Sequence, residues 1–163
     1  MNPSRVDALF REHGADVLAY ALRRTDPDTA QDVVAEVFAI AWRRINRVPD
    51  TEPVLWLYAV ARRVLANQRR AADRRQALVA VLRPLAARQA SADNGDLPLV
   101  AALARLRPDD RELLMLTAWE GLDATQAAAV LGCSRQAVDT RMHRARARLR
   151  AELDRQAQEV SIA

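Results

Sequence analysis

Apolar residues recur at helical spacing along the first third of the chain and predict two helices there. The first helix is expected over 5–24, because one face collects Val6, Leu9, Phe10, Val17, Leu18, Ala21 and Leu22. Asp26 is placed to cap a second helix, with Pro27 as its first residue, and this helix is expected to reach about Ile45. Its apolar stripe consists of Val34, Val37, Phe38, Ala41 and Ile45.

The segment Asn46–Pro53 contains two prolines and two acids, which interrupt the helical pattern and predict a loop. A third helix is expected to begin near Pro53 and to pass through Arg70. Its apolar face consists of Leu57, Val60, Ala61, Val64 and Leu65. Three helices with a shared apolar face predict a small bundle, which we assign to residues 1–75.

The periodicity weakens between 76 and 96. The stretch LVAVLRPLAARQ is broken at Pro84, and SADNGD after it is rich in turn-forming residues. This span therefore predicts a linker with some local helix.

A second group of helices follows the linker. Asp96 is placed to cap a helix over 97–107, and Pro98 is tolerated in its first turn. Pro108 opens another helix that is expected to end at Gly121. The predicted fold is therefore all-α, with two small helical domains, 1–75 and 97–155, and a tail over 156–163.

The end of the second domain has the pattern of a DNA-binding helix-turn-helix. Asp123 and Gln126 have capping-box spacing before a helix over 124–131, and Gly132–Ser134 forms a short turn. Ser134 is placed to cap the last helix, whose apolar stripe is Val138, Met142, Ala145 and Leu149. The domain is expected to insert this last helix in the major groove.

Polar residues of the last helix supply the chemistry for DNA. Arginine side chains suited to phosphates share one side of this helix: Arg141, Arg144 and Arg148. The residues expected to reach base edges are Arg135, Gln136, Asp139 and Thr140. An Asp is unusual in such a position. We expect Asp139 to pair with Arg135 four residues before it, although contact with a cytosine amino group or with a protonated His143 remains open.

The charge distribution points to a polyanionic partner. The 25 basic residues give a net charge of +4 and are all Arg. Two blocks, 62–75 and 135–150, each contain six Arg and one Asp, so each carries +5. Two basic blocks separated by mildly acidic chain favour a protein that contacts nucleic acid at two places.

Other function classes find little support. The single cysteine, Cys133, excludes an internal disulfide and a paired-thiolate zinc site, and it fills a turn better than it forms a catalytic pair with His143. Asp109, Asp110 and Glu112 lie in the first turn of a predicted helix, where they favour the helix dipole. We expect no enzyme activity and no cofactor. No signal peptide and no membrane-length apolar run is present, so we expect a cytoplasmic location without membrane insertion.

Two stretches resemble the extracytoplasmic-function (ECF) sigma factors, the promoter-recognition subunits of bacterial RNA polymerase. EGLDATQAAAVLGCSRQAVDTRMHRARARLR resembles their region four, and AQDVVAEVFAIAWRRINRVPDTEPVLWLYAVARRVLANQRR resembles region two. Together the stretches cover roughly 5–75 and 97–153, in the family's order. The elements Asp32–Trp42 and Trp56–Arg62 make the match more specific than a helix-turn-helix alone.

The resemblance implies roles by position. Asp32, Glu36 and Trp42 correspond to the face that docks on the polymerase β′ subunit, with Trp42 open to core packing as well. Residues expected to read the −10 element are Asn46, Trp56, Arg62, Arg63, Asn67 and Arg70. For Tyr58, holding single-stranded DNA and packing in the bundle are equal alternatives. The helix-turn-helix would read the −35 element, the polymerase β subunit and promoter DNA are implied partners, and an anti-sigma factor is expected.

The chain departs from the family's pattern at three positions. Ala35 stands where the family usually has Gln, Arg63 where it usually has Asn, and Asp139 where it often has a basic residue. These departures bear on which promoter sequence is read. Two alternatives are a stand-alone helix-turn-helix regulator, which would leave 32–70 unexplained, and a polymerase-binding protein that does not initiate transcription.

Overall fold

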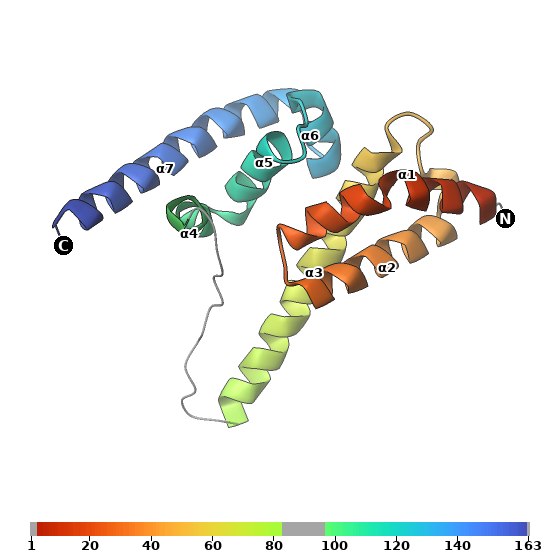
Figure 1. Cartoon of the computed structure of the whole chain (residues 1–163), viewed down its shortest axis with the longest axis horizontal. Coiled ribbons are helices and arrows are strands. Elements are labelled where there is room, and N and C mark those ends of the chain that lie inside the picture. The colour runs from red at the N-terminus through yellow and green to blue at the C-terminus, as the bar shows by residue number, and fades with distance from the viewer. Residues whose placement is uncertain (1–2, 83–96, 163) are drawn as a thin grey trace. The chain divides into compact units, whose positions relative to one another are not determined.

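The computed structural model describes residues 3–82 and 97–162, which contain helices and no β-strand (Figure 1). The helices are α1 Pro3–Leu22, α2 Pro27–Arg43, the 3-10 turn η1 Ile45–Arg47, α3 Pro53–Leu82, α4 Leu97–Arg105, α5 Pro108–Ala118, α6 Ala124–Leu131 and α7 Arg135–Ile162. The predicted all-α class is therefore confirmed.

The chain forms two compact units, Met1–Arg88 and Gln89–Ala163, which we call unit one and unit two. The boundary lies inside the predicted 76–96 linker, but α3 continues through the first part of that span to Leu82. Residues 76–82 contain no Pro or Gly, so no local signal ends α3 after the basic block 62–75. The rest of the predicted linker, with the predicted cap Asp96, lies outside the described residues.

Unit one is a three-helix bundle in which α1, α2 and α3 pack against one another. The five α3 residues predicted to face the core are all buried, as are Val37, Phe38 and Ala41 of α2. Val34 and Ile45 are only partly buried, because Ala30 and Val33 take the central positions of the α2 stripe. Tyr58 is buried and stacks on Tyr20, with ring centroids 5.0 Å apart, so it belongs to the core.

The start of α2 follows the predicted cap. The Asp26 carboxylate accepts a hydrogen bond from the Thr29 backbone N–H at 2.9 Å, and Pro27 is the first helical residue. This hydrogen bond favours the ionised carboxylate and lowers the pKa of Asp26. Local sequence signals thus determine where α2 begins.

Unit two packs α4, α5 and α6 against the long helix α7. Its core includes Leu103, Leu106, Leu113, Ala127, Ala128, Val138, Met142 and Ala145. Leu149, the fourth residue of the predicted stripe, is partly buried against this core. The predicted tail over 156–163 is not a separate segment, because α7 continues to Ile162.

The helix-turn-helix has the predicted caps. Asp123 and Gln126 exchange hydrogen bonds of 2.8 and 3.0 Å as a capping box, and the Ser134 hydroxyl accepts from the Ala137 N–H at 3.1 Å. Gly132 has φ of 67°, a left-handed conformation that ends α6 and suits glycine. The turn therefore holds α6 and the start of α7 in a defined geometry.

Candidate nucleic-acid interface

A hollow of about 530 Å³ lies between α2, η1 and α3 in unit one. It is lined by Glu36, Ile40, Arg43, Arg44, Arg47, Trp56, Val60, Arg63, Val64 and Asn67. Three predicted −10 residues, Trp56, Arg63 and Asn67, thus come together in one place. Four arginines around one aromatic ring form a site that suits phosphates and an unstacked base.

The other predicted −10 residues lie outside this hollow. Arg70 donates to the Asn67 side-chain oxygen at 2.5 Å, and so fixes an amide that lines it. Asn46 is exposed in η1, and Arg62 is partly buried one residue before Arg63. Trp56, Arg63, Asn67 and Arg70 nonetheless follow one side of α3, since their steps of seven, four and three residues match whole helical turns.

Sequence reasoning missed Arg43, Arg44 and Arg47, which line the same hollow. They lie at the end of α2 and in η1, where basic residues also favour the helix C-terminus. A pair of arginines followed by a third near a loop was the only available signal, and helix-end preference explains it equally well.

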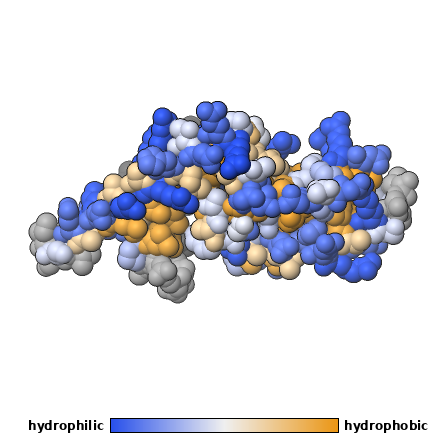
Figure 2. Space-filling view, turned by 90° about the horizontal axis from the view of Figure 1, so that it is seen from above, coloured by the Kyte–Doolittle hydropathy of each residue, from blue (hydrophilic) through white to orange (hydrophobic). Residues whose placement is uncertain are grey.

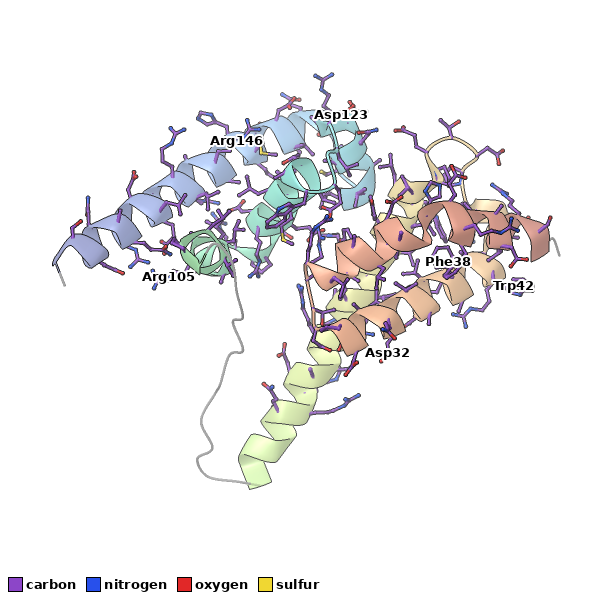
Figure 3. All side chains as sticks on the ribbon, viewed as in Figure 1. Asp32, Phe38, Trp42, Arg105, Asp123 and Arg146 are labelled. Carbon is purple, nitrogen blue, oxygen red and sulfur yellow. The ribbon has the colours of Figure 1, made fainter. Side chains whose placement is uncertain are left out.

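The predicted polymerase-docking residues Asp32, Glu36 and Trp42 spread along α2, and Figure 3 labels Asp32 near its start, Trp42 near its end and the core residue Phe38 between them. Trp42 has 40% of its surface exposed, whereas Phe38 is buried and packs edge-on against Phe10. Glu36 and Trp42 are six residues apart, which separates them by about 120° around the helix axis. Glu36 lines the hollow, so Asp32, Glu36 and Trp42 do not form one compact patch.

The start of α7 contains the predicted base-reading residues. Arg135 and Asp139 form an ion pair, Nε to Oδ2, at 3.8 Å, as expected for residues one turn apart. The side chains of Gln136 and Asp139 are exposed, and the Thr140 hydroxyl donates to the Gln136 carbonyl at 3.0 Å. Asp139 therefore lies one helical turn from the arginine with which it pairs.

The structure separates Arg148 from Arg141 and Arg144. The Arg148 guanidinium donates to the carboxylate of Asp110 on α5, which is buried, while Arg141 and Arg144 are exposed. Arg107 lies 3.9 Å from the same carboxylate. Asp110 thus does more than favour a helix N-terminus, because it ties α5 to α7 across 38 residues of sequence.

A second hollow, of about 270 Å³, lies between α4, α5 and α7 and is mostly apolar. Its lining includes Leu99, Leu103, Met115, Trp119 and Leu149, with Arg146 as the one charged residue. Trp119 is 43% exposed, and Val100, which follows the lining residue Leu99 in α4, is 50% exposed. Figure 2 shows an apolar area on unit two bordered by hydrophilic residues.

Two family models match the chain. Sigma-70 region 2 matches residues 9–75, and Sigma-70, region 4 matches residues 96–149. The ECF RNA polymerase sigma factor SigL of Mycobacterium tuberculosis (strain ATCC 25618 / H37Rv) is 32% identical over 154 residues, covering 90% of this chain and 87% of SigL. This chain belongs to the ECF sigma factors.

Further relatives agree with this assignment. The RNA polymerase sigma factor CnrH of Cupriavidus metallidurans is 33% identical, covering 90% of this chain and 85% of CnrH. The structure of CnrH in complex with the cytosolic domain of CnrY matches with a TM-score of 0.60 and 30% identity, over 94% of this chain and 90% of that one. RpoE from Bartonella quintana, in complex with the anti-sigma factor NepR, matches with a TM-score of 0.69 and 25% identity, covering 94% and 98% of the two chains.

The family fixes the function at a general level. This sigma factor directs promoter recognition by RNA polymerase, and it is not an enzyme in its own right. The family binds core polymerase and promoter DNA. A stand-alone regulator would not account for the region 2 match over 9–75.

The described residues provide neither a metal-binding cluster nor a membrane-spanning helix. No group of three or more His, Cys, Asp or Glu side chains there is placed to hold a metal ion. No described helix is long and apolar enough to cross a membrane.

Proposed function

We propose that the two units of this ECF sigma factor divide promoter recognition between a melted strand and a duplex. Unit one would hold the −10 element through the hollow between α2, η1 and α3. Unit two would hold the −35 element through the start of α7. The separate region 2 and region 4 matches support this division.

The observation that carries the −10 assignment is the composition of the hollow in unit one. Trp56 offers a ring for a flipped-out base, and the Asn67 amide offers hydrogen bonds to a base edge. Arg43, Arg47 and Arg63 surround them with positive charge for the strand's phosphates. Arg63 adds a cation where the family usually has an uncharged amide.

The −35 assignment rests on the exposed polar start of α7. Arg135 and Gln136 suit guanine and adenine edges, and Asp139 orients Arg135. Arg141 and Arg144 would contact phosphates. We assign Arg148 a different role from these two, because Asp110 already holds its guanidinium.

Polymerase docking would use the exposed side of α2. Trp42 offers a large apolar surface, and Asp32 adds negative charge for a basic partner helix such as one of the β′ subunit. Glu36 would border both the docking face and the DNA hollow. The β subunit would be the partner of unit two.

Run-off transcription tests the proposal. Core RNA polymerase is combined with the chain on a pool of genomic promoter fragments, and transcripts are compared with and without it. Specific transcripts that require the chain, and that share −35 and −10 sequences, are expected. Polymerase binding without transcripts would overturn the proposal in favour of a non-initiating partner.

We also propose that an anti-sigma factor regulates this chain in the cytoplasm. Support comes from the two similar sigma factors, CnrH and RpoE, whose structures are complexes with CnrY and NepR. The apolar hollow of unit two, with exposed Trp119, would receive an apolar helix of that anti-sigma factor. A pull-down from the native cell tests this, and recovery of polymerase alone would count against it.

A further inference from the structure

Arg5, near the start of α1, binds the segment that follows α2. Its Nη1 donates to the Ile45 carbonyl at 3.3 Å, and its Nη2 donates to the Val48 carbonyl at 2.8 Å. Nη2 also lies 2.7 Å from an Asp50 carboxylate oxygen. One guanidinium thus connects three positions that lie 40 to 45 residues away in the sequence.

These contacts fall where the backbone needs support. Ile45 begins η1, directly after Arg44 at the C-cap of α2, so its carbonyl lies outside the hydrogen bonds of that helix. The Ile45 carbonyl accepts both from Arg5 and from the Val48 N–H at 3.2 Å. A planar guanidinium can satisfy two separate carbonyls at once, which an ammonium group cannot do with the same geometry.

The rest of the loop has its own constraints. Val48 is buried with 4% of its surface exposed, so it anchors the middle of the loop in the core. Glu52 has φ of 49°, a left-handed conformation that turns the chain into α3. Between the two, the exposed Asp50 side chain pairs with Arg5. Arg5 and Val48 together therefore fix the first half of the loop.

This loop borders the hollow assigned to the −10 element, because Arg47 of η1 lines it. The Arg47 N–H donates to the Arg44 carbonyl at 2.8 Å, so η1 also positions Arg44 at the same hollow. A shift of η1 would move both arginines. We propose that Arg5 is a positioning residue that pre-shapes the −10 loop for promoter opening through its bonds to the Ile45 and Val48 carbonyls. The inference rests on the proposed −10 function of this hollow.

We call the two hydrogen bonds from Arg5 to the Ile45 and Val48 carbonyls the carbonyl clamp. Hydrogen exchange of the whole chain tests this clamp without DNA. Arg5→Ala is expected to speed amide exchange at Arg47 and Val48 about tenfold, because local opening there becomes easier. Exchange in unit two should not change. Arg11→Ala is the matched control, since it removes an exposed arginine from the same helix. Unchanged exchange at Arg47 and Val48 in Arg5→Ala would overturn the clamp.

Promoter opening tests the consequence. Permanganate reactivity of −10 thymines is followed over time in holoenzyme, on the promoter that gives the strongest wild-type run-off transcript. Arg5→Ala should slow opening about tenfold and leave core binding unchanged, whereas Arg11→Ala should open at the wild-type rate. Arg5→Lys should restore only part of the rate. Arg5→Met, which keeps an unbranched side chain without a hydrogen-bond donor, replaces Arg5→Ala if the latter lowers the melting temperature.

Two comparisons separate the alternatives. Asp50→Asn removes the exposed ion pair but leaves both carbonyl bonds, so it should have little effect; a loss equal to that of Arg5→Ala would overturn the carbonyl clamp. Slow opening with normal exchange would mean that Arg5 contacts DNA directly, which also overturns it. If the wild-type chain opens no promoter while Arg5→Ala still speeds exchange at Arg47 and Val48, the clamp stands and the proposed −10 function fails.

Discussion

The two arginine-rich helices, α3 and α7, use the same residue type in different surroundings. Each basic block, 62–75 in α3 and 135–150 in α7, contains six Arg and one Asp. In α3, Arg63 lies beside Trp56 and Asn67 at a hollow. In α7, Arg135 and Arg148 pair with acids.

The difference supports the two kinds of nucleic-acid contact that we propose. An aromatic ring and an amide among arginines suit bases that have left the stack, because each base presents a face and an edge. In α7, the exposed Arg141 and Arg144 follow Arg135, which pairs with Asp139, and this arrangement along one helix suits a duplex whose phosphates and base edges have fixed positions. Equal charge in the two blocks therefore does not imply equal chemistry.

The largest expected effect comes from Arg141 and Arg144 of α7, which are exposed and, within the described residues, unpaired. Replacing both Arg141 and Arg144 by Ala should weaken holoenzyme binding to a −35 duplex fragment by about 3 kcal/mol, roughly 100-fold, through two lost charged contacts. The slope of log affinity against log salt should fall by about two. Salt titration by filter binding measures both. The double variant Arg63→Ala/Arg70→Ala in α3 is the comparison. If it weakened binding to this −35 duplex fragment equally, the distinction between α3 and α7 would be lost.

Arg148→Ala should act on stability rather than on DNA. It leaves the buried Asp110 carboxylate without its main partner, and Arg107 at 3.9 Å compensates only in part. Because the Arg148 side chain is 39% exposed, we expect a loss of about 2 kcal/mol in the free energy of unfolding of unit two, below the cost of breaking a fully buried pair. Denaturant unfolding measures it, with Arg144→Ala as a control near zero.

The opposite result would return Arg148 to the group of phosphate contacts, with Arg141 and Arg144, that helical spacing predicts. If Arg148→Ala left stability unchanged and reduced the salt slope as Arg144→Ala does, Arg148 would be a phosphate contact. A double-mutant cycle with Asp110→Ala isolates the pair, and a coupling energy near zero would show that the ion pair contributes nothing.

The fate of Arg148 also shows what the sequence could and could not predict. Helical spacing and caps are local, so the starts of α2, α5, α6 and α7 and most of the core stripes were predictable. Spacing also grouped Arg148 with Arg141 and Arg144, because periodicity describes only one helix. The partner that decides its role, Asp110, lies 38 residues away.

The candidate site in unit one shows the same limit. Trp56, Arg63 and Asn67 share one side of a single helix, so their proximity followed from the sequence. Arg43 and Arg44 join them because the end of α2 packs near α3, and Arg47 joins them from η1, which Arg5 contacts from another helix. Contacts between helices required the structure.

Trp56→Ala should test the single-strand half of the comparison. Loss of one stacked base is expected to weaken holoenzyme binding to single-stranded −10 DNA by about 1.5 kcal/mol, roughly tenfold. Trp56→Phe should retain most of the affinity, because a ring remains. Fluorescence anisotropy with a labelled oligonucleotide measures both. Wild-type affinity for Trp56→Ala would leave the ring with a packing role only.

The smallest effect is expected at Asp139. Its pair with Arg135 is exposed and one turn long, so Asp139→Ala should change stability by less than about 0.5 kcal/mol. Without the carboxylate, Arg135 is no longer oriented, and the preference at one −35 base pair should relax while total affinity changes little. Binding to a library of −35 variants measures this. A uniform loss of affinity on every sequence would mean that Asp139 supports the helix and does not take part in reading bases. A changed preference for cytosine alone would mean that Asp139 contacts a base itself.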